Sequence, residues 1–168
     1  MGTWGTGPFG GGDAAADLVV RLGALPANRR LFAVRTALAD AVEERWYLDA
    51  PEGETAVAAA ALLAAARPGG AAGTERGGAA GTGAEAAGAG AVGVAGSVVC
   101  GGVAVSVPRC VIPQPPPELT GLAVRALDRV LAPDSELAEL WDESDSGPQW
   151  RASVAGLRAA LGPAAQRV

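Results

Sequence analysis

The middle of this chain of 168 residues limits what the rest of it can fold into. Residues 68–107 include 13 Gly and 11 Ala among 40 positions. Ordering a backbone costs ~1–2 kcal/mol per residue, and such small side chains bury too little apolar surface to offset that cost. Five of the twelve prolines follow within residues 108–117 and favour an extended path. We therefore expect residues 68–117 to be a disordered low-complexity linker.

The first part of the chain, residues 1–67, is rich in Ala and Leu, and its spacing predicts an N-terminal arm and three helices. We expect the first helix to run from its cap Asp13 to about Gly23, and Asn28 to cap the second. Pro51 suits the first position of the third, which we expect to be an inner helix because its residues are nearly all Ala and Leu. The first two apolar rows are Leu18, Val19, Leu22 and Leu25, and Leu31, Val34, Leu38, Val42 and Trp46.

The last part, residues 118–168, returns to apolar residues at helical steps of three and four, and predicts three more helices of the same domain. The first spans about 118–132, Asp134 or Ser135 caps the second, and the third ends before Gly162. Their apolar rows are Leu119, Leu122, Ala123, Ala126, Leu127, Val130 and Leu131; Leu137, Leu140 and Trp141; and Trp150, Val154, Leu157 and Leu161. The predicted fold is all-α: a small bundle of about six amphipathic helices with a long Gly/Ala/Pro-rich disordered insert.

One part of the linker carries a competing signal. Residues 97–100 and 103–106 are rich in Val and flank a Gly-Gly pair, which is typical of a β-hairpin with a two-residue turn. An isolated hairpin is only marginally stable in water. Cys100 and Cys110 lie in the same region. We interpret them as two small apolar residues, with one disulfide as the alternative.

The stretch 86–107 has 22 residues without a charge, which is long enough to cross a membrane. Its composition argues against insertion, because it is mostly Gly, Ala and Val, of which Gly and Ala supply little transfer free energy. The N-terminal sequence lacks the basic start and apolar stretch of a secretory signal. We therefore expect a cytoplasmic protein.

Missing residue types exclude several kinds of chemistry. The chain has no His and no Lys, so His-containing catalytic triads, His zinc ligands and lysine Schiff bases are excluded. The formal net charge is −5 with scattered Arg residues, which argues against nucleic-acid binding. A G-x-G-x-x-G match at residues 88–93 lacks the strand before it and the helix after it, and a calcium-loop-like start at residues 142–147 lacks the final acid. We predict no cofactor and no metal.

Candidate partner-binding residues lie on one predicted helix and in the N-terminal arm. Residues 134–145 carry six acids and no base. Three of these acids share a helix face, which is either a docking face for a basic partner or an ordinary solvated face. Two aromatic residues of the Gly-rich arm either pin it to the bundle or line a groove. The five candidates are Glu136, Glu139, Glu143, Trp4 and Phe9. The other three Trp residues fall on apolar rows, where we expect core positions.

Four runs of sequence carry a resemblance to a family. They are residues 1–9 with 13–17, the turn 47–54, the helix 122–131 and the run 134–141. With these motifs the chain resembles bacterial domain-of-unknown-function family 4259. It departs from the family's pattern in having Gly at residues 10–12, where an Asn/Asp pair is usual, and in its long insert. The resemblance implies the fold and a bacterial origin, and it gives no catalytic residue.

Three functions fit these observations. We favour a non-enzymatic helical protein–protein interaction module, a class that by analogy includes toxin-neutralising immunity proteins. The first alternative is a carboxylate-based, metal-dependent hydrolase that uses acids such as Asp13, Asp17 and Glu43. The second is a protein tethered to a membrane through residues 86–107. The sequence does not predict the partner or the oligomeric state.

Overall fold

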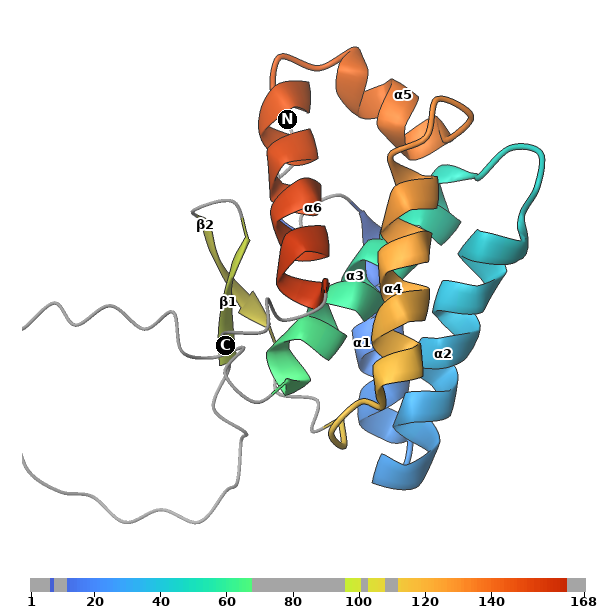
Figure 1. Ribbon diagram of the computed structural model, residues 1–168, viewed down its shortest axis with the longest axis vertical. Coiled ribbons are helices and arrows are strands. Elements are labelled where there is room, and N and C mark those ends of the chain that lie inside the picture. The colour runs from blue at the N-terminus through green and yellow to red at the C-terminus, as the bar shows by residue number, and fades with distance from the viewer. Residues whose placement is uncertain (1–6, 8–11, 68–95, 101–102, 108–111, 163–168) are drawn as a thin grey trace, which may run out of the picture.

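The computed structural model describes residue 7 and residues 12–67, 96–100, 103–107 and 112–162. In this part of the chain six helices form an all-α bundle, and one short hairpin lies beside it (Figure 1). The helices are α1 (Asp13–Ala24), α2 (Ala27–Glu43), α3 (Ala50–Ala66), α4 (Pro117–Val130), α5 (Glu136–Asp142) and α6 (Gly147–Leu161). The all-α bundle predicted from the sequence is confirmed.

Helix α3 is the centre of the bundle. It packs against each of the other five helices, and every residue from Ala56 to Ala64 is buried. A helix surrounded on all sides needs an apolar surface all round, and Ala side chains let neighbouring helices approach closely. The expected inner helix is therefore confirmed.

The two parts of the chain on either side of the insert form one core. Helix α4 packs against α2, α3 and α6, and buried residues from both parts belong to the same cluster. The largest fully buried side chains are Leu18, Leu22, Leu38, Leu48, Leu63, Leu127, Leu157, Leu161, Val34 and Val130. Burying a Leu or Val side chain is worth ~1.5–3 kcal/mol, so this shared cluster holds the bundle together.

Residues 96–100 and 103–107 form the hairpin that the sequence offered as the competing signal, so the expectation of a linker is wrong for these residues. Strands β1 (Gly96–Cys100) and β2 (Val103–Val107) are antiparallel, with Cys100 opposite Val103. The pair lies close to α3 and α6, which supplies the surface that an isolated hairpin lacks (Figure 1). The expectation of a linker for 68–95 and 108–111 lies outside the described residues, as does Cys110.

The insert rejoins the core earlier than predicted. Ile112 is buried, although we expected linker up to residue 117. Helix α4 begins at Pro117, one residue before the predicted start, because proline has its φ fixed for a helix and needs no hydrogen bond at this position. The helix ends at Val130, two residues before the predicted end, and is otherwise confirmed.

Two predicted helix caps are wrong. Asp13 is the first residue of α1 and the cap position is Gly12, while α2 begins at Ala27 after Pro26, so Asn28 lies inside it. At α1 the carboxylate of Glu54, from α3, accepts a hydrogen bond from the Ala14 N–H and fills the space beside Gly12. A side chain from another helix therefore takes the place of the local cap that we expected.

Two residues of the predicted apolar rows are exposed. Trp46 lies beyond the end of α2, and 87% of it is exposed. Leu140 lies on α5 and is 51% exposed, whereas Leu137 and Trp141 are buried as predicted. The buried stripe of α5 runs through Leu137, Ala138 and Trp141, and Leu140 is roughly a third of a turn from its centre.

No helix in the described part of the chain is long and apolar enough to cross a membrane. Of the stretch 86–107 that we considered as a span, residues 96–100 and 103–107 form the hairpin strands and the others lie outside the described residues.

Two glycines allow a matched test of the packing. A Cβ on Gly147, at the start of α6, would collide with the carbonyl oxygen of Trp141, whereas one on Gly121, inside α4, would meet open space. We expect Gly147→Ala to lower the free energy of unfolding by ~1–3 kcal/mol. Gly121→Ala should raise it by ~0.5–1 kcal/mol, because Ala is the better helix former. Urea unfolding of both variants measures the difference, and equal stabilities would contradict this packing.

Candidate functional site

Two segments that are far apart in the sequence meet at one end of the bundle. Leu48, between α2 and α3, forms a parallel bridge with Ser135, which precedes α5. The Leu48 N–H donates to the carbonyl oxygen of Asp134 at 3.1 Å, and the Glu136 N–H donates to the carbonyl oxygen of Leu48 at 2.9 Å. Leu48 and Ser135 are both fully buried. This Leu48–Ser135 pairing fixes the position of the loop between α2 and α3.

Two of the candidate acids form hydrogen bonds beside the Leu48–Ser135 pairing, and we call the pairing together with these bonds the joint. One carboxylate oxygen of Glu136 accepts a hydrogen bond from the Ala50 N–H at 2.7 Å and so caps α3 from another helix. The Tyr47 hydroxyl donates to Glu139 at 2.7 Å. Glu143 is exposed and follows the last residue of α5. The three acids predicted to form one face thus have different surroundings.

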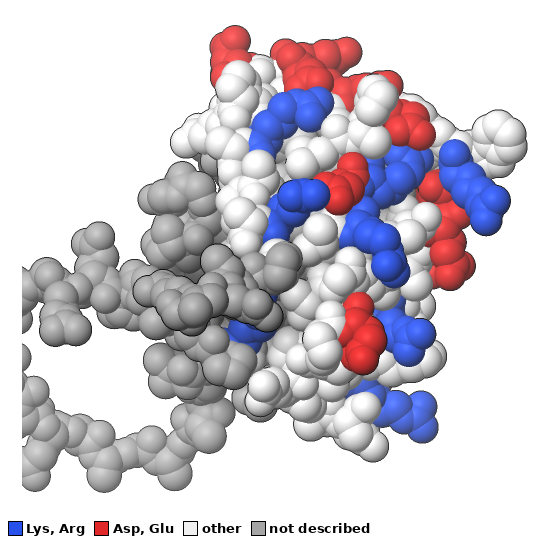
Figure 2. Space-filling view, in the orientation of Figure 1, with Lys and Arg blue, Asp and Glu red and all other residues white. Residues whose placement is uncertain are grey.

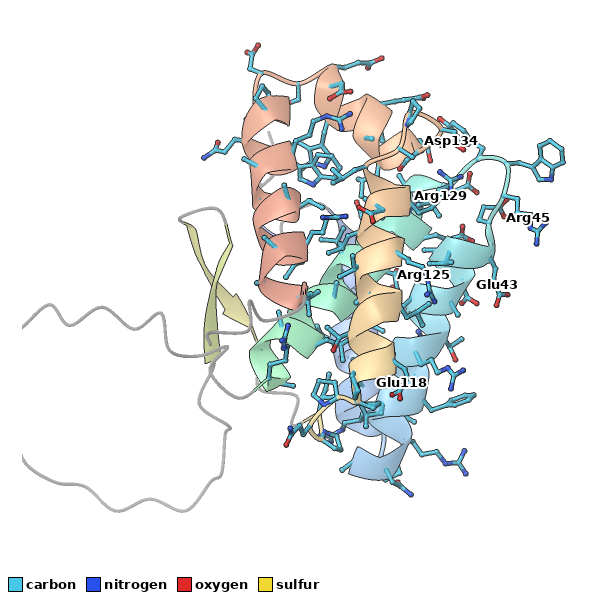
Figure 3. The ribbon with its side chains drawn as sticks, in the orientation of Figure 1. Glu43, Arg45, Glu118, Arg125, Arg129 and Asp134 are labelled. Carbon is cyan, nitrogen blue, oxygen red and sulfur yellow. The ribbon has the colours of Figure 1, made fainter. Side chains whose placement is uncertain are left out.

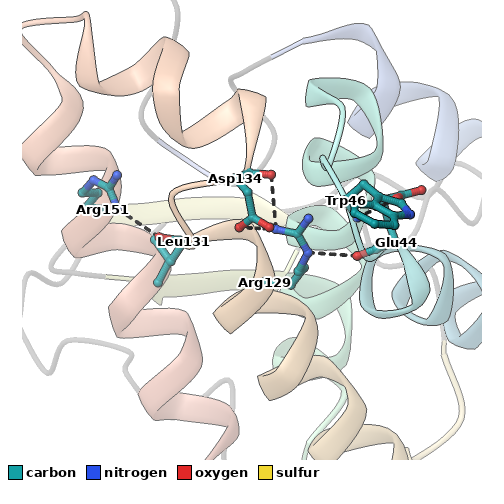
Figure 4. A network of polar contacts seen from close by, with 6 residues as sticks. All are labelled: Glu44, Trp46, Arg129, Leu131, Asp134 and Arg151. Carbon is teal, nitrogen blue, oxygen red and sulfur yellow. Dashed lines mark hydrogen bonds and ion pairs between the residues drawn. The ribbon is translucent and has the colours of Figure 1, made fainter.

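Arg129 of α4 holds the loop from the other side (Figure 4). Its Nε donates to the carbonyl oxygen of Glu44 at 3.0 Å, and one terminal nitrogen donates to the Asp134 carboxylate at 2.9 Å. The side chain of Arg129 is only 14% exposed. The guanidinium therefore places a positive charge between two acidic segments at the point where they meet.

Trp46 stands on this fixed loop with its indole in solvent. Its backbone N–H donates to the Glu44 carboxylate at 3.1 Å, and its neighbours in the chain are held by Arg129 and by the Leu48–Ser135 pairing. Figure 3 shows the neighbouring Arg45 pointing away from the bundle. The prediction that Trp46 belongs to the core is wrong, because α2 ends at Glu43 and the extended chain after it no longer follows the helical period.

The acids around the loop repel one another, and this repulsion is visible in two raised pKa values. The hydrogen bond to Glu139 raises the pKa of Tyr47 to about 12, with smaller contributions from burial and from the charges of Glu139, Glu136 and Asp49. Burial raises the pKa of Glu52, and the charges of Asp49, Glu44 and Asp40 raise it further. Every charge that shifts these two groups is therefore negative.

The fold concentrates negative charge at this end of the molecule. Residues 40–54 carry six acids and one base, and residues 134–145 carry six acids and no base. Together these two segments, which we call the acidic end, have a formal charge of −11, so the rest of the chain carries +6 against a total of −5. Figure 2 shows acids gathered where α5 lies, whereas Arg side chains and further acids are interspersed over the remainder of that face.

The other predicted site residues have the following positions. Trp141 and Trp150 are core residues, as expected, and their rings stack with centroids 5.7 Å apart and an interplanar angle of 6°. Trp4 and Phe9 lie outside the described residues, and so does the G-x-G-x-x-G match. In the calcium-loop-like run, Asp142 forms a bidentate ion pair with Arg151.

The acids considered for hydrolysis do not lie together. Asp13 and Asp17 are exposed on the first turns of α1, whereas Glu43 is the last residue of α2 and lines a different face. Among the described residues, no group of three or more Cys, Asp or Glu side chains is placed to hold a metal ion. The structure therefore does not gather these three acids into one pocket.

The family model described as Domain of unknown function (DUF4259) matches residues 2–153. The chain belongs to this family. No curated protein and no solved structure matches it.

Three of the four runs that carry the DUF4259 resemblance meet at the Leu48–Ser135 pairing. The turn 47–54 supplies Tyr47 and the start of α3, the run 134–141 supplies the acids that bind them, and the helix 122–131 supplies Arg129. At Gly53 an added Cβ would lie 3.2 Å from the Leu137 Cβ, so these two motifs are also in close contact. In this DUF4259 chain the motif residues build a structural joint beneath an exposed loop.

Sequence reasoning missed the roles of Arg129 and Tyr47. Both belong to motif runs. Arg129 fits the predicted helix and Tyr47 fits the predicted turn, so nothing in the local pattern indicates that either forms a hydrogen bond to a distant segment. The usable signal was the acidic run 134–145, because so many like charges need a cation nearby in the fold.

The raised pKa of Tyr47 gives a direct test of the bond to Glu139. Tyr47 is the only tyrosine, so absorbance of tyrosinate reports it alone. Because its folded-state pKa of about 12 exceeds its ordinary 10.0, its contribution to stability is full below pH 10 and is lost as the pH rises through 12. We expect Glu139→Ala to lower this pKa toward 10.0, and Glu143→Ala to leave it unchanged. Equal titration curves for all three proteins would rule out the bond.

The role of Arg129 is tested by its removal. Arg129→Met leaves the Glu44 carbonyl and the Asp134 carboxylate without their donor, so the free energy of unfolding should fall by ~1.5–3 kcal/mol. Arg45→Met, which removes an exposed guanidinium from the same loop, should change it by no more than ~0.5 kcal/mol. Denaturant unfolding compares the two, and a small effect of Arg129→Met would show that the joint holds without the cation.

Proposed function

We propose that this chain is a non-enzymatic, cytoplasmic protein-interaction module that binds a basic partner protein at its acidic end, with Trp46 as the anchor. The observation that carries the proposal is the 87% exposure of Trp46 on a loop whose backbone is fixed on both sides. An indole in water forgoes ~2–3 kcal/mol of burial free energy. Burial in an interface would recover it.

The fixed loop favours binding because its backbone is already ordered before a partner binds. Association normally loses free energy in immobilising loops and side chains, and a preformed anchor reduces that loss. Trp is among the residues that contribute most to interface affinity when they insert into a partner's pocket. Exposed Leu140 and Tyr47 belong to the same two segments and extend the apolar surface available to a partner.

Charge supports the choice of partner. The acidic end carries a formal charge of −11, and Arg129 and Arg151 offset only part of it. A concentrated negative field speeds the encounter with a basic protein. A partner rich in Lys or Arg would relieve the repulsion among these acids and could place a cation over the Trp46 ring.

Affinity capture from the cytosol of the source organism tests the proposal. Trp46→Ala should lose the captured partner, whereas Phe32→Ala, which truncates another exposed aromatic residue away from the acidic end, should retain it. The partner's interaction surface should be basic, and its capture should weaken as salt is added. A partner held equally well by the Trp46→Ala variant would overturn this site.

Variants that remove charge without removing a described contact test the role of the acids independently of Trp46. Asp49, Glu52 and Glu143 have no side-chain hydrogen bond or ion pair among the described residues, so their amide variants together remove three charges and no described contact. We expect this triple variant to bind the same partner with a slower association rate and a shallower salt dependence. An unchanged association rate would show that the acids are only a solvated face.

A further inference from the structure

A second surface lies between α2 and α4, and of its lining residues only Val42 and Glu43 belong to the acidic end. The two helices border a groove of about 680 Å³. Leu31, Val42 and Leu122 form part of its floor and are only partly buried, while Phe32 at its edge is 70% exposed. These apolar side chains lie side by side at the surface, where a contact with another protein would bury them.

The two helices run in the same direction. Their C-terminal ends are joined by the bond from Arg129 to Glu44, and their N-terminal ends meet where Phe32 and Glu118 line the same groove (Figure 1). Position along the groove therefore follows residue number on both helices.

The charges that line the groove alternate across it. Along α2, Arg35 comes first and Glu43 last, whereas along α4, Glu118 comes first and Arg125 follows two turns later. Figure 3 labels Glu118, Arg125 and Glu43 in these positions. All four lie at the surface, and none has a hydrogen bond or ion pair with another described residue. The groove is thus neutral overall, with like charges at diagonal corners and opposite charges at adjacent ones.

This pattern is complementary to itself. A two-fold axis lying in the plane of the face places a second copy opposite the first. If the axis runs along the helices, Arg35 faces Glu118 of the partner subunit and Glu43 faces Arg125 of the partner subunit. If it runs across them, Arg35 faces Glu43 of the partner subunit and Glu118 faces Arg125 of the partner subunit. Both arrangements pair every charge with its opposite.

We propose that the α2–α4 face is a homodimer interface in which Phe32 of each copy packs on the groove of the other. A second copy fits better than a basic or acidic partner, because either of those would leave two of the four groove charges facing a like charge. The four charged pairs lie at the rim and set orientation, and the apolar floor supplies the affinity. Trp46 does not line the groove, so this inference does not depend on the proposed function.

Sedimentation velocity of the full chain over a range of concentrations tests the proposal. We expect the wild-type protein to pass from monomer to dimer as the concentration rises. The double variant Arg35→Glu with Arg125→Glu makes the groove wholly acidic, and Glu43→Arg with Glu118→Arg makes it wholly basic. Each should remain monomeric alone, because four like charges would face four more. Mixed together, the two variants should form a one-to-one heterodimer.

Two further variants test the apolar contact and provide a control outside the groove. Phe32→Ser should weaken dimerisation by roughly tenfold or more, since it removes an apolar group buried only in the dimer. Trp46→Ala should dimerise like the wild type. A wild-type chain that stays monomeric throughout, or charge variants that dimerise on their own, would overturn the proposal. A monomer that instead binds an added protein through this groove would assign the face to another occupant and would overturn it as well.

Discussion

The main-chain pairing of Leu48 with residues 134–136 is the contact on which the acidic end depends. It brings together two segments that carry a combined formal charge of −11, and like charges at such short range repel. Buried main-chain hydrogen bonds, the Glu136 cap on α3 and the Arg129 guanidinium offset this repulsion. The loop that carries Trp46 has a defined position only because this joint exists.

The bundle therefore offers two surfaces with different physical character. The acidic end has a strong field of one sign and an exposed indole, which suits a partner of opposite charge. The α2–α4 face is neutral overall, with alternating charges over an apolar floor, which suits a copy of itself. The two surfaces share Val42 and Glu43, whereas Trp46 and residues 134–145 do not line the groove.

Local pattern predicted the helices well and their ends poorly. The rows of α1, α4 and α6 follow the helical period because one face of each of these helices is buried, and periodicity reports that directly. Trp46 continued the row of α2 in register, yet the helix ends at Glu43 because the following residues pair with Asp134 and Glu136 instead. Likewise Gly12 needs no capping side chain because Glu54 supplies the acceptor from α3. Periodicity carries no information about bonds between segments so far apart.

Three things follow from the sequence alone: residue spacing established the all-α class, small apolar side chains the inner position of α3, and the absence of His and Lys the chemistry that is excluded. These three features can be read from a short run of residues or from the composition. Only the assembled fold shows which acids act as caps, which aromatic residues are exposed and where charge gathers. Each of these depends on which segments become neighbours, and that is set by the packing of the whole core around α3 rather than by any local run of residues.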